Sequence, residues 1–450
     1  MNSERTHPNL GEVVVATQVI TSDLSPRRAR NIILLLAASV ALMMTGFGII
    51  MPVFARRLGE FGSGVEALGL MTMSFALAQL LAAPFMGSFA DRFGRRPLVL
   101  VALAGFTVAN IGFLFAPSTE VFILVRALEG ALTAGLFPAA MGVVADIVPE
   151  DKRAQWVGIV MGSYGAGFIF GPVAGGVLYD GWGFAAPFVA SAVLAFIAFI
   201  AATILVPETR TREVRWREEL RQRRAAATAP AAQQASVWAS LPRPIHVFGT
   251  LLLLDFIIVF AFAFIEPQMV FYFFEELGWT TVQFGAVVSA YGLAMVLGRS
   301  SDRYGRKSII VIGILFTTGF YFGLSVVTWF TLLMLVAVVA GLGTALTSPA
   351  LSAFYLDITA EQHRSRVVGI KGASASLGGV AGPLLVVGAS AWTTPQGVFV
   401  IAGVLWQAGD GCPNRVARRR AEGEDGAPDG ALRNTRPIEG PQRNSNSIAT

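Results

Sequence analysis

Ionisable side chains that interrupt long apolar runs are the first candidates for chemistry in this chain. Arg126 and Glu129 occur in the run VRALEGALTAG, one helical turn apart, so they share a face of the predicted helix. A charge inside an apolar helix is costly to desolvate and is seldom kept without a partner or a use. The two residues could provide a titratable group inside the span, or they could form an ion pair with a purely structural role. Both interpretations stay open.

A second run contains two acids. Asp255 and Glu266 are eleven residues apart, which places them within about 20° of each other around a helix. Phe262 lies on the same stripe, and a face of acid, aromatic ring and acid suits a lipophilic cation that competes with a proton. Glu266 could instead lie near a membrane surface and reach water. Lys371 is expected to extend its ammonium group to the nearer interface.

A charged motif, GSFADRFGRRP at residues 87–97, returns in altered form as RSSDRYGRKS at residues 299–308. The residues repeated at an offset of 211 positions are Asp91, Arg92, Gly94 and Arg95, which return as Asp302, Arg303, Gly305 and Arg306. The offset persists downstream, so the chain consists of two copies of one long unit.

The first copy of this motif has the parts of a latch. Gly87 allows close approach of helices, and Asp91 can lie at a helix N-terminus, where the dipole favours an acid. Arg95 and Arg96 can pair with an acid across the bundle, for which we expect Asp146. The alternative is that these arginines only anchor the topology of the chain.

A glycine-rich stretch, GSYGAGFIFGPVAGG, occupies residues 162–176. Gly167, Gly171 and Gly175 recur every four residues and form a stripe without side chains, against which another helix can pack closely. Pro172 is expected to bend the helix, and Gly176 completes the stretch. Ordinary packing of small residues is the alternative interpretation.

The composition is that of a membrane protein. Apolar residues make up 54% of the chain and charged residues 14%, well below the usual quarter. Runs of about twenty apolar residues can each cross a hydrocarbon core of about 30 Å. Basic residues are concentrated in alternate loops, which predicts that both termini and the central loop are cytoplasmic. The positive net charge is therefore a sign of topology, and we expect no nucleic-acid partner.

These runs predict an all-α integral membrane protein with two pseudo-symmetric six-helix bundles. The spans are expected at residues 31–54, 67–87, 97–116, 120–146, 155–178, 185–206, 246–273, 282–298, 308–327, 329–355 and 367–388, with a twelfth from Gly397. The predicted parts are a cytoplasmic segment (1–30), an N-terminal bundle (31–206), a cytoplasmic linker (207–245), a C-terminal bundle (246–408) and a polar, disordered tail (409–450).

Two spans in the second half are short. The apolar run of the eighth, Phe284–Leu297, has 14 residues, or about 21 Å of helix. The twelfth run ends at Ala408 and is followed by an arginine-rich tail without lysine or aromatic residues. A deletion in the eighth span and a frameshift before the tail would explain both features.

The repeated loop motif resembles the signature of the major facilitator superfamily. The stretch at residues 162–176 is similar to the antiporter signature of its drug:proton branch, and Arg126 with Glu129 resembles an R-x-x-Q-G motif in which the acid replaces glutamine. The resemblance implies a substrate site between two bundles, a latch on the cytoplasmic side and a role for the arginine in proton transfer. It also implies that Phe47, Phe137, Tyr164 and Tyr291 border the central cavity.

The implied function is proton-driven efflux of tetracycline-like or other lipophilic drugs. We expect a monomer in the cytoplasmic membrane, with the proton gradient as energy source and neither a cofactor nor a metal. No phosphate-binding loop is present in the sequence, so no ATP is implied. The ratio of 31 arginines to 3 lysines indicates a GC-rich, bacterial source.

Three alternatives remain. The chain could transport a metabolite or sugar, although the antiporter signature argues against uptake. It could be a degenerate homologue that does not transport, as the two short spans suggest. A membrane enzyme is disfavoured, because His7, His246 and His363 lie far apart in the sequence and Cys412 is the single cysteine.

Overall fold

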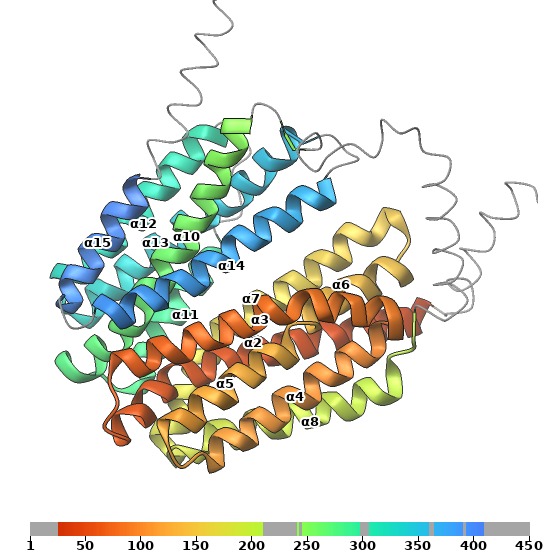
Figure 1. Ribbon diagram of the computed structural model, residues 1–450, viewed down its shortest axis with the longest axis horizontal. Helices are drawn as coiled ribbons and strands as arrows, with labels where there is room; N and C mark the ends of the chain where they lie inside the picture. The colour runs from red at the N-terminus through yellow and green to blue at the C-terminus, as the bar shows by residue number, and fades with distance from the viewer. Residues whose placement is uncertain are drawn as a thin grey trace, which may run out of the picture.

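The computed structural model describes residues 26–209, 241–242, 245–297, 306–359, 364–389 and 393–408. These residues form helices joined by short turns, arranged as two groups that lie side by side (Figure 1). Ten helical segments in this part of the chain are long and apolar enough to cross a membrane. The predicted all-α membrane fold is therefore confirmed.

The first group contains six spans. Its helices are α2 (Pro26–Glu60), α3 (Val65–Phe93), α4 (Arg95–Phe115), α5 (Thr119–Thr133), α6 (Leu136–Ile147), α7 (Glu150–Trp182) and α8 (Ala185–Leu205). The fourth span, expected as one helix, is divided into α5 and α6 by a turn at Ala134 and Gly135. A Cβ on Gly135 would contact the Leu98 side chain, so glycine allows α4 to approach closely at this turn.

The second group repeats this arrangement. Its elements are α10 (Ile245–Phe271), the π-helical turn η3 (Tyr272–Glu276), α11 (Thr281–Leu297), α12 (Arg306–Val326), α13 (Phe330–Asp357), α14 (Arg364–Ala389) and α15 (Pro395–Ala408). The two spans expected to be short, α11 and α15, have 17 and 14 residues here. Apart from residues 207–209, 241–242 and 245, the predicted linker lies outside the described residues, and so does the predicted tail.

The helices carry apolar side chains on both their inner and outer faces. In the first group Leu103, Val143 and Ala195 are fully buried between helices. On the outside, Phe85, Phe115 and Ile204 are more than 70% exposed, as expected of side chains that face lipid. Helices suit this environment because each satisfies its own backbone hydrogen bonds.

Among the described residues, the two groups meet at one end. There α11 packs on α7 and α14 packs on α3, as the left side of Figure 1 shows. We call this the closed end; the turns after Glu60 and Trp182 lie there. At the other end, near Gly94 and Pro149, glycines 158 and 162 of α7 and 369 and 372 of α14 have no neighbour within 4 Å of a Cβ position. We call this the open end.

Candidate functional site

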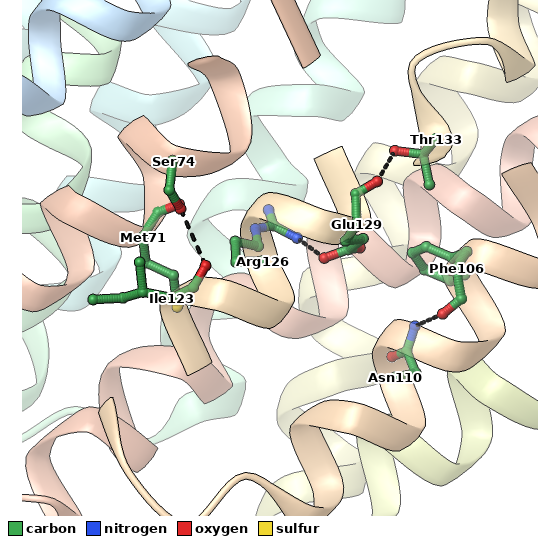
Figure 2. Close-up of polar contacts among 8 residues, drawn as sticks. All are labelled: Met71, Ser74, Phe106, Asn110, Ile123, Arg126, Glu129 and Thr133. Atoms are coloured by element: carbon green, nitrogen blue, oxygen red, sulfur yellow. Dashed lines mark hydrogen bonds and ion pairs between the residues drawn. The ribbon is translucent and has the colours of Figure 1, made fainter. Parts of the chain in front are cut away.

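An ion pair is buried in α5, at the position where the sequence predicts one. The Arg126 Nη1 atom lies 2.7 Å from Oε2 of Glu129, and the two residues are 5% and 1% exposed. Figure 2 shows the two side chains turned toward each other along one face of the helix. The Thr133 hydroxyl donates to the Glu129 backbone carbonyl in the next turn. The contact is thus as the one-turn spacing predicts.

Aromatic rings surround the arginine. Its Cζ atom lies 4.1 Å from the ring centre of Phe75, 5.1 Å from that of Phe47 and 5.2 Å from that of Phe54. These rings belong to α3 and α2. A guanidinium over ring faces is stabilised by the negative charge density of those faces, most strongly when water is excluded.

Glu266 brings the second group of helices to the same place. It lies in α10, is 8% exposed, and interacts electrostatically with Arg126. Arg126 is thus in contact with Glu129 and interacts electrostatically with Glu266, and we call these three predicted proton-coupling residues the interbundle cluster: Arg126, Glu129 and Glu266. Because α5 and α10 belong to different bundles, this cluster is sensitive to any movement of one bundle against the other.

Asp255 lies in a different cluster. Its Oδ1 atom is 3.9 Å from Nζ of Lys371 in α14, and that ammonium group donates to the Ser352 hydroxyl in α13 at 2.8 Å. The Lys371 ammonium group also lies 5.3 Å from the ring centre of Tyr355 in α13. We call these four residues the C-bundle cluster. The expectation that Lys371 extends to the interface is wrong, because an acid and a hydroxyl inside the bundle hold its ammonium group.

The predicted aromatic residues are spread over several places. Phe137 of α6 packs edge-on against Tyr164 of α7, with ring centres 5.7 Å apart, and Tyr164 is 40% exposed. Tyr291 of α11 shares a hydrogen bond of 2.8 Å with the Thr344 hydroxyl. Phe262 is half-buried in α10. Of the predicted lining residues, only Phe47 contacts a predicted coupling residue in the contacts described here.

The glycine stripe of α7 packs against α2, as predicted. A Cβ on Gly171 would lie 2.6 Å from the Thr45 carbonyl oxygen, and one on Gly175 would lie 2.5 Å from that of Ile49. A Cβ on Gly167 would contact the Ala41 carbonyl. A Cβ on Gly176 would point the other way and lie 2.7 Å from the Thr281 carbonyl oxygen at the start of α11. The helix continues through Pro172. Because the stripe packs on α2 and Gly176 packs on α11 of the other bundle, this stretch lies between the two bundles.

The loop motif forms the predicted ion pair at the open end. Arg95 Nη1 lies 3.1 Å from Oδ2 of Asp146, which joins α4 to α6 within the first bundle. The backbone N–H groups of Arg95 and Arg96 donate to the Glu208 carboxylate at 3.1 and 3.2 Å. Gly94 has a φ of 103°, and a Cβ there would contact that same carboxylate, so only glycine suits this position.

The remaining residues of this motif are exposed, as Arg92 and Gly87 are, half-buried, as Arg96 is, or outside the described residues. Arg96 donates to the Thr203 carbonyl oxygen at 2.6 Å, and Arg92 lies over the Phe93 ring at 5.7 Å. Gly87 has no neighbour within 4 Å of a Cβ position, so the predicted close approach is absent in this conformation. The Asp91 and Arg306 side chains, and residues Asp302, Arg303 and Gly305, fall outside what the structure describes.

Sequence reasoning missed three contributors. Glu208 follows the sixth span directly, and an acid there could have been matched to the N-terminus of the next basic loop. Ser352 and Tyr355 occur in an otherwise apolar run, where nothing in their spacing points to Asp255. Within the described ranges, no three His, Cys, Asp or Glu side chains come together as a metal site requires.

The sequence is similar to a known family of membrane proteins. The family model described as Major Facilitator Superfamily matches residues 35–300 and 251–406. Multidrug resistance protein 2 of Bacillus subtilis is 27% identical over 363 residues, which are 79% of this chain and 88% of that protein. The class C tetracycline resistance protein of Escherichia coli is 27% identical over 374 residues, 80% of this chain and 89% of that one.

Solved structures share the fold. A bacterial homologue of the human lysosomal transporter Spinster, in an inward-facing and unoccupied conformation, matches with a TM-score of 0.69 at 15% identity. The match covers 89% of this chain and 99% of that one. The human organic anion transporter MFSD10 matches with a TM-score of 0.63 at 19% identity, over 87% of this chain and 100% of that one.

Proposed function

This chain belongs to the Major Facilitator Superfamily, and from that premise we propose that it exports drug-like, lipophilic molecules across the cytoplasmic membrane in exchange for protons. The observation that carries this proposal is the interbundle cluster, in which one arginine interacts with an acid from each bundle. The similarity to bacterial multidrug and tetracycline resistance proteins supports the drug-like class of cargo.

The orientation of the chain follows from its charges. The open end carries Arg92, Arg95 and Arg96 on one turn and Lys152 with Arg153 on the next. Basic residues collect on the cytoplasmic side of membrane proteins. The open end is then cytoplasmic, both termini are cytoplasmic, and the conformation described here is inward-facing. A monomer is sufficient for this transport, because both bundles belong to one chain.

The cargo enters between the bundles from the cytoplasm. The rings of Phe47 and Phe75 and the carboxylate of Glu266 offer apolar surface and a negative charge to a lipophilic cation. Arg126 and Glu129 keep the polar groups of this region paired while the site is empty. We propose that the apolar lining also includes the rings of Phe137, Tyr164, Phe262 and Tyr291.

Proton and cargo compete for the same acid. When the bundles rock so that the site opens outward, a proton binds the Glu266 carboxylate and the cargo cation leaves. The protonated carrier returns inward, and loss of the proton to the cytoplasm restores the site. Glu129 and Asp255 are the other candidate proton carriers. The glycine stripe of α7 allows this movement. The latch residues, from Gly87 to Arg96 with Asp146, lock it.

Transport into inverted membrane vesicles tests this function. We expect a proton gradient to drive accumulation of ethidium or tetracycline, a gradient-collapsing ionophore to abolish it, and Glu266→Gln to reduce it at least tenfold. The matched control is Gln268→Asn on the same helix, at a residue that is also buried, which changes a polar side chain without changing any charge. Export of a sugar or metabolite, with no accumulation of either drug, would favour the alternative transport function.

A further inference from the structure

A groove on the outer surface of the first bundle is separate from the proposed transport site. It lies between α4 and α8 and has a volume of about 600 Å³; small-molecule sites usually have about 300–1,000 Å³. We call it the α4–α8 groove. The acids and the arginine of the interbundle cluster belong to α5 and α10, and neither helix contributes to the described lining of the groove. The groove can therefore hold a molecule other than the cargo.

The α4–α8 groove opens toward lipid. Both helices are long and apolar enough to span a membrane, and the lining residues Val193, Phe196 and Ile197 are each more than half exposed. On α4 the groove extends from Leu114, beside the closed end, for about 15 Å toward the open end. That length is about half of a hydrocarbon core of about 30 Å. The groove therefore lies alongside one leaflet of the bilayer, the leaflet at the closed end.

Two polar side chains of α4 interrupt this apolar lining. The Thr107 hydroxyl donates to the Leu103 carbonyl oxygen at 2.9 Å, and Nδ2 of Asn110 donates to the Phe106 carbonyl oxygen at 2.8 Å, as Figure 2 shows for Asn110. An oxygen in place of that nitrogen would face another oxygen, which fixes the orientation of the amide. Asn110 is fully buried, and its Oδ1 atom has no hydrogen-bond partner among the described residues. The atom left without a partner is therefore an acceptor.

The lining determines which ligand the α4–α8 groove suits. A buried acceptor without a partner is unfavourable, and a donor from a ligand would remove that cost. The described lining contains no charged side chain, so an ionised ligand would find no counterion there. Asn110 lies about one turn from Leu114 and the closed end. A ligand donor at Asn110 thus lies nearer the membrane surface, with room for an apolar chain toward the middle of the membrane, as a lipid is oriented.

We propose that the α4–α8 groove binds a single-chain membrane lipid with a free hydroxyl group. The hydroxyl donates to Oδ1 of Asn110, and the chain lies along Val193 and Phe196. A lipid of the same length without a donor leaves Asn110 unpaired and binds more weakly. This site depends neither on the identity of the cargo nor on proton coupling, because its lining belongs to α4 and α8 alone.

Photolabelling of the purified protein in phosphatidylcholine nanodiscs tests this site. The probe is dodecanol with a diazirine in its chain, and the labelled residues are identified by mass spectrometry. We expect labels on the groove segments of α4 and α8 at least tenfold above those around Leu81 and Phe85 of α3, which are also exposed. Excess dodecanol should displace the probe, whereas dodecyl methyl ether, which has no donor, should displace it at least fivefold less effectively.

Two substitutions at neighbouring residues of α8 locate the site. Val193→Trp adds bulk to the lining, and Leu194→Trp adds the same bulk at an exposed residue that is not part of the described lining. We expect at least a tenfold loss of labelling with Val193→Trp and wild-type labelling with Leu194→Trp. Asn110→Leu removes the acceptor at nearly constant volume, so the alcohol and the ether should then displace the probe equally well.

Three results would overturn the proposal. Labels spread evenly over the lipid-facing helices would show that the groove takes up only bulk lipid. Equal displacement by the alcohol and the ether in the wild type, or a preference for the alcohol that persists in Asn110→Leu, would exclude the hydrogen bond. Equal labelling of Val193→Trp and Leu194→Trp would place the lipid elsewhere. If a variant does not fold, the labelling pattern of the wild type and its preference for the alcohol over the ether decide the question.

Discussion

Arg126 is bounded by a carboxylate on one side and by aromatic rings on the other. The salt bridge to Glu129 and the contacts with Phe75 and Phe47 replace the water that a guanidinium loses when it is buried. A buried pair of this kind adds little stability by itself, but removing one partner leaves an uncompensated charge. Loss of one partner is therefore expected to lower the stability of the protein more than loss of both.

Substitution of this pair tests that dependence. We expect Arg126→Met to destabilise the protein by about 3–5 kcal/mol, because Glu129 then remains charged and buried without a partner. The double variant Arg126→Met/Glu129→Met should recover most of this loss. Thermal unfolding of the purified variants in detergent measures both effects. Equal stability of the single and double variants would contradict the coupling.

Sequence spacing predicts contacts within one helix but not contacts between helices. Arg126 and Glu129 are neighbours on one helix, so their contact follows from spacing alone. Lys371 is 116 residues from Asp255, and no periodicity relates positions on different helices. Glu208 and Arg95 are separated by 113 residues. Contacts of this kind depend on how the helices pack, which the sequence pattern of a single span does not contain.

At the scale of elements, the packing of α7 depends on its glycines. Gly171 and Gly175 leave room for the α2 backbone, whereas Gly158 on the same helix has no neighbour within 4 Å. The stripe could be predicted from its four-residue spacing. The division of the fourth span at Ala134 and Gly135 could not, because the apolar run continues through both residues.

Gly171→Val and Gly158→Val form a matched pair on α7. Valine at position 171 would place side-chain atoms against the Thr45 backbone, where a Cβ alone would lie 2.6 Å from the carbonyl oxygen. We expect at least a tenfold loss of drug accumulation in vesicles with Gly171→Val, and near wild-type accumulation with Gly158→Val. Equal transport by the two variants, at equal amounts in the membrane, would rule out a role for close α2–α7 packing.

Two hydrogen bonds join the two bundles at the closed end. Arg56 Nη2 donates to the Trp279 carbonyl oxygen at 2.8 Å, and the Val282 N–H donates to Oδ2 of Asp180 at 3.1 Å. The Arg56 guanidinium also lies 4.3 Å from the Phe274 ring centre. Arg56 belongs to α2 and Asp180 to α7, so both hydrogen bonds join the first bundle to the residues around the start of α11. They stabilise the conformation in which this end is closed against one in which it is open.

Removal of both contacts should shift the balance between these states. At about 1 kcal/mol for each hydrogen bond, Arg56→Ala with Asp180→Ala is expected to change the ratio of the two states roughly thirtyfold. Spin labels at the exposed positions Trp182 and Trp329, with Cys412 replaced by serine, report the separation of the bundles at the closed end. We expect a longer distance component in the double variant; an unchanged distribution would show that other contacts hold this end.

At the scale of the whole molecule, the described parts of the two bundles meet at one end and lie apart at the other. The twelve apolar runs and their repetition at an offset of 211 were enough to predict the two bundles. The end at which they meet could not be predicted, because the same sequence must be compatible with both conformations. The interaction of Glu266 with Arg126 could not be predicted either, because it joins the two halves of the chain.

The central claim is that cargo and proton compete for Glu266. The most direct measurement is proton release from the purified protein in weakly buffered detergent solution when ethidium is added. We predict release of protons that saturates with ethidium binding, and no release from Glu266→Gln. We also predict an apparent affinity that weakens as pH falls, because protonation removes the charge that binds the cation. Ethidium binding without proton release in the wild type, at every pH tested, would contradict the account.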